Sequence, residues 1–376
     1  MNKKKILVDI YYLHVAQTGI KTYIECLCRE IEKQESTEFE FIVTPNFQKI
    51  RRKNFFKGKT ALWKNLLFQL LYFFRKLMIL PLLSVRHNAS IVFSPDILSP
   101  LWARGVKVSV IHDAFFWENP SHYNPLWLKT FLGFLKGSLK RNARVVTVSE
   151  YSKKQLRKYL NMPELPIYVV YPSSGLTPKQ QPLEARPLIS PPYFLHVGVM
   201  EKRKNLPTLV AAFSRLVKIE GCDDFRLVLV GQRGPRKALD DWDTVVSMVR
   251  ELKLEEKVLR PGFVDARKLE NYYRHAMGYV FPSTNEGFGM PVLEAFSFGV
   301  PVIIANQGSL LEVGGEAVWA VRENTAAGFE QAMYVLNQDE SLREALVLRG
   351  HERLREFSPA NFFLSLQDCF RKILHE

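Results

Sequence analysis

The sequence has few cysteines and no pattern that would pair them for metal binding or redox chemistry. Its 376 residues include 4 cysteines, and no two of them have the Cys-x-x-Cys spacing, which argues against zinc ribbons and thioredoxin-like motifs. Free thiols suit a reducing compartment, so a cytoplasmic protein is expected. The sequence also lacks a His-Glu-x-x-His motif and any RNA- or DNA-binding pattern. We therefore expect neither a metalloprotease nor a nucleic-acid partner.

Acidic residues are scarce in the first half of the chain. Residues 1–176 contain 27 Lys and Arg against 12 Asp and Glu, a net charge of +15, whereas the remaining residues sum to −1. A surface that is basic on one side only is typical of proteins that meet an anionic membrane or an acidic substrate.

An uninterrupted apolar run long enough to span a membrane is also lacking. A spanning helix needs about 20 apolar residues, but Lys64, Arg75, Lys76 and Pro81 interrupt the run at residues 61–83. Lys64 and Arg75 share a helix face, which predicts a narrow basic stripe on an apolar helix. Basic residues also precede the run: Arg51, Arg52, Lys53, Lys57 and Lys59. Two interpretations stay open, a helix in the membrane interface against anionic lipid and a helix packed in the first domain with its stripe in water.

The chain has the length of two domains and the pattern of two parallel sheets. Short apolar runs recur between helical patterns, which indicates sheets covered by helices on both faces. The runs lie at residues 5–10, 39–44, 90–94, 106–111, 144–149, 166–171, 193–198, 225–231, 278–283 and 301–305. We predict an α/β fold of two Rossmann-like, doubly wound domains facing across a cleft, where ligands of such sheets bind.

The domain boundaries follow from a proline-rich segment. Six prolines lie between Pro172 and Pro192, a composition typical of a linker. The predicted division is a first domain at residues 1–172, a linker at 173–192 and a second domain at 193–357. Ser358 and Pro359 are suited to start a last helix, residues 358–376, which we expect to pack back on the first domain.

The segment after the run at 278–283 is the most informative for chemistry. It reads Asn-Glu-Gly-Phe-Gly-Met-Pro-Val-Leu-Glu from Asn285 to Glu294. Gly287 and Gly289 allow the backbone to approach a ligand, and the helix start offers free amides to an anion. Glu286 and Glu294 would repel phosphate, so we expect them to accept hydrogen bonds from sugar hydroxyls.

A basic loop after the run at 193–198 supplies the opposite charge. Arg203 and Lys204 are placed where the negative charge of a leaving diphosphate needs neutralisation. The Arg guanidinium can donate two hydrogen bonds to phosphate oxygens, and the Lys ammonium offers a compact positive charge. A basic loop without further signals is usually solvated surface. Because the glutamate loop lies in the same half of the chain, a binding role is favoured here.

At these residues the chain resembles the retaining, nucleotide-sugar-dependent glycosyltransferases of group 1 (family 4). Glu286 and Glu294, with seven residues between them, resemble that family's E-x7-E motif. The segment GVMEKRKNLPTLVAAF is similar to its phosphate-binding loop and following helix. Residues 9–27, VIHDAFFWENP, VVTVSEYSKKQL and two further segments of the second half also match, so that only residues 45–88 lie outside the resemblance.

The resemblance implies the GT-B fold, with the donor held mainly by the C-terminal domain, and a role for each matched residue. Arg203 and Lys204 would stabilise the diphosphate, Glu286 would contact the transferred sugar, and Glu294 would bind the ribose hydroxyls. His112 would lie across the cleft near the donor sugar. The remaining expected contacts to substrate come from Gly19 beside the diphosphate, Gly262, Phe263 and Val264 beside the base, and the amides of Phe288 and Gly289.

The expected activity is transfer of a hexose from a nucleotide diphosphate sugar to a lipid-linked or polysaccharide acceptor in bacterial cell-surface glycan synthesis. The RKN form of the loop favours GDP-mannose as donor. No metal and no cofactor besides the donor substrate are expected, because Asp241-Trp242-Asp243 lies in a helical stretch and is interpreted as an exposed helix face. The expected place is the cytoplasm, with peripheral attachment to the inner face of the membrane as one interpretation of the basic half. Two alternatives stay open: a GT-B nucleotide-sugar epimerase or phosphorylase, and a non-catalytic membrane-bound partner.

Overall fold

The structure, a computed structural model, divides the chain into two units. It describes residues 3–16, 18–33, 36, 38–52, 62–175, 186–234 and 237–376. The first unit comprises Met1–Gly175 and Ser358–Glu376, and the second comprises Leu176–Phe357. Most of the predicted linker, residues 176–185, lies outside the described residues, as do Lys53, Lys57 and Lys59.

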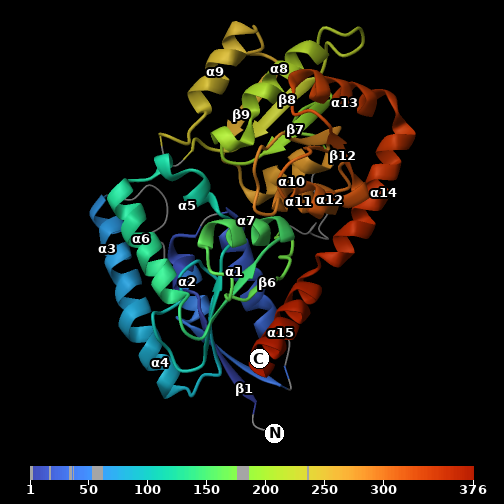
Figure 1. The fold of residues 1–376 in the computed structure, drawn as a ribbon. Coiled ribbons are helices and arrows are strands. Elements are labelled where there is room, and N and C mark those ends of the chain that lie inside the picture. Colours follow the sequence, from blue (N-terminus) through green and yellow to red (C-terminus); the bar gives the residue numbers. More distant parts are fainter. Residues whose placement is uncertain are drawn as a thin grey trace. The chain divides into compact units, whose positions relative to one another are not determined.

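The first unit is built on a parallel sheet of six described strands in the order β2-β1-β3-β4-β5-β6 (Figure 1). The strands are β1 (Lys4–Asp9), β2 (Phe39–Thr44), β3 (Ile91–Ser94), β4 (Val106–Val110), β5 (Ala143–Thr147) and β6 (Ile167–Val169). The chain goes from β1 outward to β2 and returns to β3 on the other side of β1. Strand order therefore reverses between β1 and β3, and the carboxyl ends of these two strands flank the place where such sheets bind ligands.

Helices connect the strands of the first unit. They are η1 (Tyr11–His14), α1 (Thr18–Lys33), α2 (Phe47–Arg52), α3 (Leu62–Phe74), the π-helical turn η2 (Arg75–Ile79), α4 (Leu80–Arg86), α5 (Phe115–Glu118), η3 (Pro120–His122), α6 (Pro125–Ser138), α7 (Glu150–Leu160) and α15 (Pro359–His375). The predicted start of the last helix is confirmed, because the Ser358 hydroxyl accepts a hydrogen bond from the Asn361 amide at 3.1 Å. Its apolar face packs on the first unit, with Phe362 edge-on to Tyr23 and Phe370 edge-on to Phe93.

The second unit repeats the same plan with a parallel sheet in the order β12-β11-β10-β7-β8-β9 (Figure 1). Its strands are β7 (Tyr193–Val197), β8 (Arg226–Val230), β9 (Val258–Gly262), β10 (Gly278–Phe281), β11 (Val302–Ala305) and β12 (Val318–Val321). Here strand order reverses between β7 and β10. The loops after these two strands are the ones that carry Arg203 and Lys204 on one side and Glu286 on the other.

The helices of the second unit cover that sheet on both faces. They are η4 (Lys202–Lys204), α8 (Leu206–Leu216), α9 (Trp242–Glu251), α10 (Ala266–Arg274), α11 (Met290–Ser297), α12 (Leu310–Gly314), η5 (Gly315–Ala317), α13 (Ala326–Gln338) and α14 (Glu340–Glu356). Leu209 and Phe213 of α8 and Phe329 and Met333 of α13 are fully buried in one apolar cluster with the strands. This core fixes the strands whose carboxyl ends hold the polar loops.

The apolar segment at residues 61–83 differs from the prediction at its basic residues. Arg75 does not lie in a stripe in water: its Nε atom is 2.8 Å from Asp9 Oδ1, and both side chains are buried. Lys76 is fully buried as well, with Nζ 2.9 Å from Asp9 and 3.0 Å from Asp96. Asp9 ends β1 and Asp96 follows β3, so the two cations are drawn to the carboxylates at the reversal point of the first sheet.

Candidate functional site

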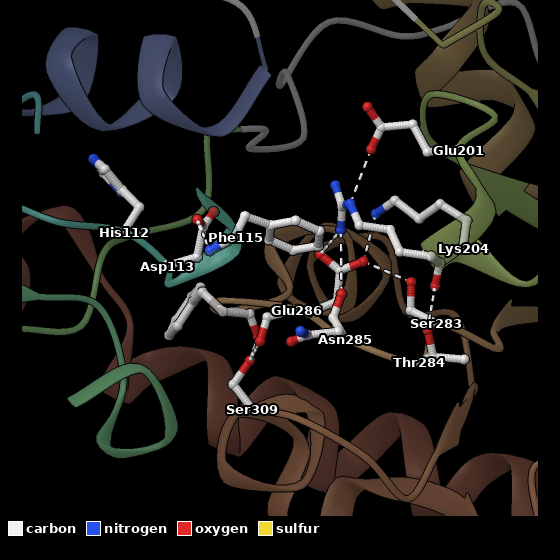
Figure 2. A network of polar contacts seen from close by, with 12 residues as sticks. His112, Asp113, Phe115, Glu201, Lys204, Ser283, Thr284, Asn285, Glu286 and Ser309 are labelled. Carbon is white, nitrogen blue, oxygen red and sulfur yellow. Dashed lines mark hydrogen bonds and ion pairs between the residues drawn. The ribbon is translucent and has the colours of Figure 1, made fainter. Parts of the chain in front are cut away.

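The loops after β7 and β10 bring an acidic and two basic side chains into direct contact. Arg203 Nη1 lies 2.6 Å from one carboxylate oxygen of Glu286, and Lys204 Nζ lies 2.7 Å from the other. The Ser283 hydroxyl donates a third hydrogen bond to Glu286 at 2.6 Å. Figure 2 shows the carboxylate of Glu286 beside Lys204 and Ser283. The predicted phosphate-binding and sugar-binding residues of this unit thus form one cluster at the strand reversal.

Backbone contacts hold the two loops together. The Thr284 amide donates to the Arg203 carbonyl at 2.8 Å, and Arg203 Nη1 donates to the Asn285 carbonyl at 3.3 Å. The Ser309 hydroxyl lies 2.9 Å from the Glu286 carbonyl and 2.8 Å from the Phe288 carbonyl. These contacts hold the backbone of the two loops together at the cluster.

Left-handed backbone conformations shape both loops. Asn205 ends η4 with φ 53°, and its side chain accepts a hydrogen bond from Thr208 at 2.7 Å, which turns the chain into α8. Gly289 has φ 108° immediately before α11, a conformation that residues with a side chain rarely adopt. The predicted glycine requirement therefore applies at Gly289, where the backbone turns into the helix.

The charges in the cluster perturb one another strongly. Burial alone would raise the pKa of Glu286, but Arg203 and Lys204 lower it to about 2. Burial lowers the pKa of Lys204 to about 8, and the positive charge of Arg203 acts in the same direction, against the attraction of Glu286. Burial also opposes the charge of Arg203, yet Glu286 and Glu201 raise its pKa. The Lys204 ammonium further lies 4.6 Å from the centre of the Phe281 ring, a favourable cation–π distance.

Glu294 lies one turn into α11 in a different environment. Its carboxylate accepts a hydrogen bond from the Tyr273 hydroxyl at 3.0 Å. Burial raises its pKa to about 7, since Tyr273 and Lys204 compensate only in part. The two glutamates of the spaced pair are therefore distinct: Glu286 is firmly ionised, and Glu294 titrates near neutral pH.

The predicted base-binding residues follow β9. Gly262 ends that strand with φ 73°, and the Phe263 side chain is 77% exposed, so its ring is open to a stacking partner. Phe288 differs from Phe263 because its ring is buried edge-on against Phe357. The Phe288 ring is therefore closed to a ligand, and the expected contact of its amide stays a prediction.

Two predicted residues lie in the first unit. Gly19 is in the first turn of α1. His112 follows β4, with Nε2 3.3 Å from the Pro95 carbonyl and its ring edge-on to Tyr23. Burial lowers the pKa of His112 to about 4, so it is neutral at physiological pH. Their expected contacts with a donor held by the second unit stay predictions.

The pair Asp241 and Asp243 differs in part from its interpretation as an exposed helix face. Asp243 is exposed and pairs with Arg233 at 2.5 Å, but Asp241 is buried at the start of α9. Among the residues that the structure describes, no group of three or more His, Cys, Asp or Glu side chains is arranged to hold a metal ion.

Several residues at the site were missed by the sequence reasoning. Ser283 stands three residues before Glu286, a spacing that brings its hydroxyl to the carboxylate. His196 ends β7 with Nδ1 3.0 Å from the Val280 carbonyl, and its buried Nε2 has no hydrogen-bond partner among the described residues. The signal for His196 is a polar residue in an otherwise apolar strand directly before Gly198.

Comparisons with known proteins identify the family of the chain. Residues 184–353 match the family of group 1 glycosyl transferases. The chain is 30% identical over 264 residues to O-antigen chain mannosyltransferase B of Escherichia coli, a match that covers 68% of this chain and 67% of that protein. It is also 30% identical over 198 residues to O-antigen chain mannosyltransferase RfbU of Salmonella typhimurium, covering 52% of this chain and 51% of the relative.

Solved structures share the architecture. Sucrose-phosphate synthase from Thermosynechococcus elongatus superposes with a TM-score of 0.72 at 18% identity, over 100% of both chains. WaaG, a glycosyltransferase involved in lipopolysaccharide biosynthesis, superposes with a TM-score of 0.65 at 13% identity, over 97% of this chain and 99% of that one. At such identities the likeness establishes the fold.

Proposed function

Because the chain belongs to the group 1 glycosyltransferases, we propose that it transfers mannose from GDP-mannose to a lipid-linked or polysaccharide acceptor in cell-surface glycan synthesis, with retention of anomeric configuration. The predictions of a glycosyltransferase and of the GT-B fold are confirmed. The family implies a nucleotide-sugar donor and a glycan acceptor. Mannose is favoured by relatives that include O-antigen mannosyltransferases.

The observation that carries the proposal is the contact of Arg203 and Lys204 with Glu286 at the strand reversal of the second unit. Breaking the bond between the sugar C1 and the diphosphate oxygen leaves an electron pair on the leaving diphosphate. Fixed cations at that oxygen stabilise the transition state more than the ground state. Arg203 stays charged at all relevant pH values and offers a planar fork to the phosphate oxygens.

In this proposal Glu286 pairs with Arg203 and Lys204 when no donor is bound. When the donor binds, its diphosphate also pairs with these two cations. The carboxylate keeps hydrogen bonds from Ser283 and Lys204 on one oxygen, which leaves the other to accept from a sugar hydroxyl when Arg203 turns to phosphate. Because its pKa is about 2, Glu286 does not serve as a proton donor at neutral pH. The acceptor hydroxyl attacks C1 from the side that the diphosphate leaves, and its proton passes to the departing phosphate oxygen.

Glu294 and Phe263 are proposed to recognise the nucleoside. A ribose hydroxyl replaces or joins the Tyr273 hydroxyl as a donor to Glu294, and ionisation of the carboxylate strengthens that bond. The exposed Phe263 ring offers a stacking surface for the base at the end of β9.

A ligand panel tests the donor. The protein is melted with GDP, UDP, ADP and GDP-mannose, since a ligand at a hundredfold its dissociation constant stabilises the folded state by about 2.7 kcal/mol. Stabilisation by GDP and GDP-mannose alone is expected. Stabilisation by UDP alone would contradict the proposed donor while leaving the glycosyltransferase assignment intact.

Transfer itself is tested with radiolabelled GDP-mannose and membranes as the source of acceptor. Label is expected in a lipid-linked or polysaccharide fraction, with the donor's anomeric configuration in the product. Incubation of the donor without acceptor is the control for the other activities of this fold. An epimerised nucleotide sugar would indicate an epimerase, a sugar phosphate formed with inorganic phosphate would indicate a phosphorylase, and no turnover with bound GDP would indicate a non-catalytic protein.

The site of action is part of the proposal. We place the enzyme in the cytoplasm, attached peripherally to the inner face of the cell membrane, where a lipid-linked acceptor is available. The net charge of +15 in residues 1–176 supports attachment to anionic lipid.

A further inference from the structure

One face of the helical segment α3–η2–α4 exposes apolar side chains along its whole length. Six of them recur every three or four residues and are each more than half exposed: Trp63, Leu66, Leu70, Phe74, Met78 and Leu82. From residue 63 to residue 82 a helix extends roughly 28 Å. Continuous exposed apolar surface of this kind is uncommon on a soluble protein and marks an interaction surface.

The opposite face of the same segment is fixed to the first sheet by charge. Arg75 and Lys76 both point inward, where they pair with Asp9 and Asp96. The Tyr72 hydroxyl also donates to Asp96, and Lys76 donates to Ser94 at 3.2 Å. Neighbouring residues of an α-helix lie about 100° apart, and the wider π-helical turn at Arg75–Ile79 accompanies the shared direction of the two cations.

By length and composition, Trp63–Arg86 is the one described helical segment that could cross a membrane. The ion pairs argue against crossing. Moving this segment into a bilayer would strip Arg75 and Lys76 of their carboxylates and leave Asp9 and Asp96 buried without partners, a strongly unfavourable exchange. The apolar face can enter lipid only as deep as the sheet beneath it allows.

The chain segments that form the apolar face and its neighbour α6 lack acidic residues. Residues 41–95 contain no Asp or Glu, and neither do residues 119–149. Helix α6 lies beside α3, with Phe134 edge-on to Phe73 at 5.2 Å (Figure 1). Its exposed side carries Lys129 and Lys136. An apolar face next to basic, acid-free helices is complementary to a surface with apolar chains beneath anionic headgroups.

We infer that the apolar face of α3–η2–α4, with the basic side of α6, lies in the interface of an anionic lipid bilayer without spanning it. This deepens the proposed function, on whose membrane location it rests, by naming the docking surface. Apolar side chains enter the boundary between headgroups and acyl chains, and Lys129 and Lys136 contact the headgroups. The ion pairs of Arg75 and Lys76 keep the helix attached to the sheet.

The test is co-sedimentation of the full-length protein with vesicles of phosphatidylethanolamine and phosphatidylglycerol. Wild-type protein is expected to pellet. Leu70→Gln/Phe74→Gln is expected to bind roughly a hundredfold less, because two apolar side chains no longer leave water. The matched control is Leu348→Gln/Leu364→Gln, which changes two leucines of α14 and α15 that are at least half exposed and should bind like wild type.

A second arm separates charge from apolar burial. Lys129→Gln/Lys136→Gln should weaken binding at low salt and matter little at high salt, since screening already removes that contribution. The control Lys237→Gln/Lys268→Gln changes two exposed lysines of the second unit and should leave binding unchanged. Equal losses in the lysine variant and its control would overturn the assignment of α6.

A third arm distinguishes lying on the membrane from crossing it. In cells, the full-length protein should fractionate with membranes and be released by alkaline carbonate. Retention in carbonate-washed membranes would overturn the non-spanning arrangement. No vesicle binding, or self-association in solution that Leu70→Gln/Phe74→Gln abolishes, would overturn lipid as the occupant and favour a second copy of the chain in the latter case.

GDP-induced stabilisation is measured on every variant. Unchanged stabilisation with lost vesicle binding supports the docking surface. Lost stabilisation in Leu70→Gln/Phe74→Gln would show that the substitutions act through the fold, which would overturn the assignment of this face. A wild-type protein that binds vesicles but no nucleotide would refute the proposed donor site and leave the docking surface standing.

Discussion

Replacement of Lys204 is the sharpest test of the donor site. Its Nζ atom is buried, 2.7 Å from Glu286 and 4.6 Å from the Phe281 ring. Removing one partner of a buried ion pair usually costs about 3–5 kcal/mol, because the other charge is left uncompensated. Here Glu286 keeps Arg203 at 2.6 Å and Ser283 at 2.6 Å. We therefore expect Lys204→Ala to lower the free energy of unfolding by only about 1–3 kcal/mol.

The kinetic effect should be of similar size in free energy and directly measurable. A charge-assisted contact to phosphate contributes about 1.5–3 kcal/mol, which corresponds to a loss of about 10- to 150-fold in kcat/KM for the donor. The assay is initial-rate transfer from GDP-mannose together with calorimetric binding of GDP. Thermal unfolding shows whether the variant is folded at the assay temperature.

Lys202→Ala is the matched control for Lys204→Ala. It removes the same charge from the same short helix η4, but Lys202 is exposed. Long-range electrostatics alone would affect both variants similarly, whereas a direct contact affects Lys204→Ala far more. If the two folded variants lose the same small amount of activity, Lys204 does not contact the diphosphate and the proposed role is refuted.

Four further predictions follow from the site. Glu294 has a pKa of about 7 without ligand, so GDP affinity should rise with pH through 7, and in Glu294→Gln it should no longer depend on pH in this range. The free energy of unfolding should fall from pH 4.5 to 7 by up to about 3 kcal/mol, because Glu294 keeps its proton to higher pH in the folded state than in the unfolded state. Burial lowers the pKa of His196 to about 4, so between pH 4 and 6.5 His196 is protonated in the unfolded chain but not in the folded one. The free energy of unfolding should therefore rise with pH over this range by up to about 3 kcal/mol. Denaturant titrations of His196→Asn should no longer show that rise. Phe263→Ala should weaken GDP binding at least about fivefold through lost base stacking and leave thermal stability unchanged, since the ring is 77% exposed. Transfer should persist in excess EDTA, because Arg203 and Lys204 supply the positive charge; loss of activity that magnesium or manganese restores would contradict this.

The strands that were predicted correctly share one property. They are rich in apolar residues, which parallel strands covered on both faces bury, although some, such as β2 and β4, also contain a charged residue. The two missed strands are both at sheet edges. β9 contains Arg260 and Pro261, which an edge strand tolerates and a central strand does not. β12 is a short apolar run of four residues that is only partly buried.

The site could be predicted in part for a related reason. Loops at the carboxyl ends of central strands follow long apolar runs, so Arg203, Lys204 and Glu286 stand out against the strands before them. Their mutual contacts could not be predicted, because 82 residues separate Lys204 from Glu286. Which loops meet depends on the strand order, with β10 adjacent to β7 rather than to β9.

The same separation explains the error at Arg75. From the local sequence alone, a cation on an apolar helix is expected to be exposed to solvent. Its carboxylate partner, Asp9, lies 66 residues earlier in the chain, and Asp96, the partner of Lys76, lies 20 residues later. Both carboxylates stand at strand ends on either side of the reversal in the first sheet, the position that the second sheet uses for Arg203, Lys204 and Glu286. In the first unit a helix of the chain itself thus lies at the strand reversal. Because Arg75 and Lys76 face inward to Asp9 and Asp96, the apolar side of this helix faces outward, and that side is the one proposed to contact the membrane.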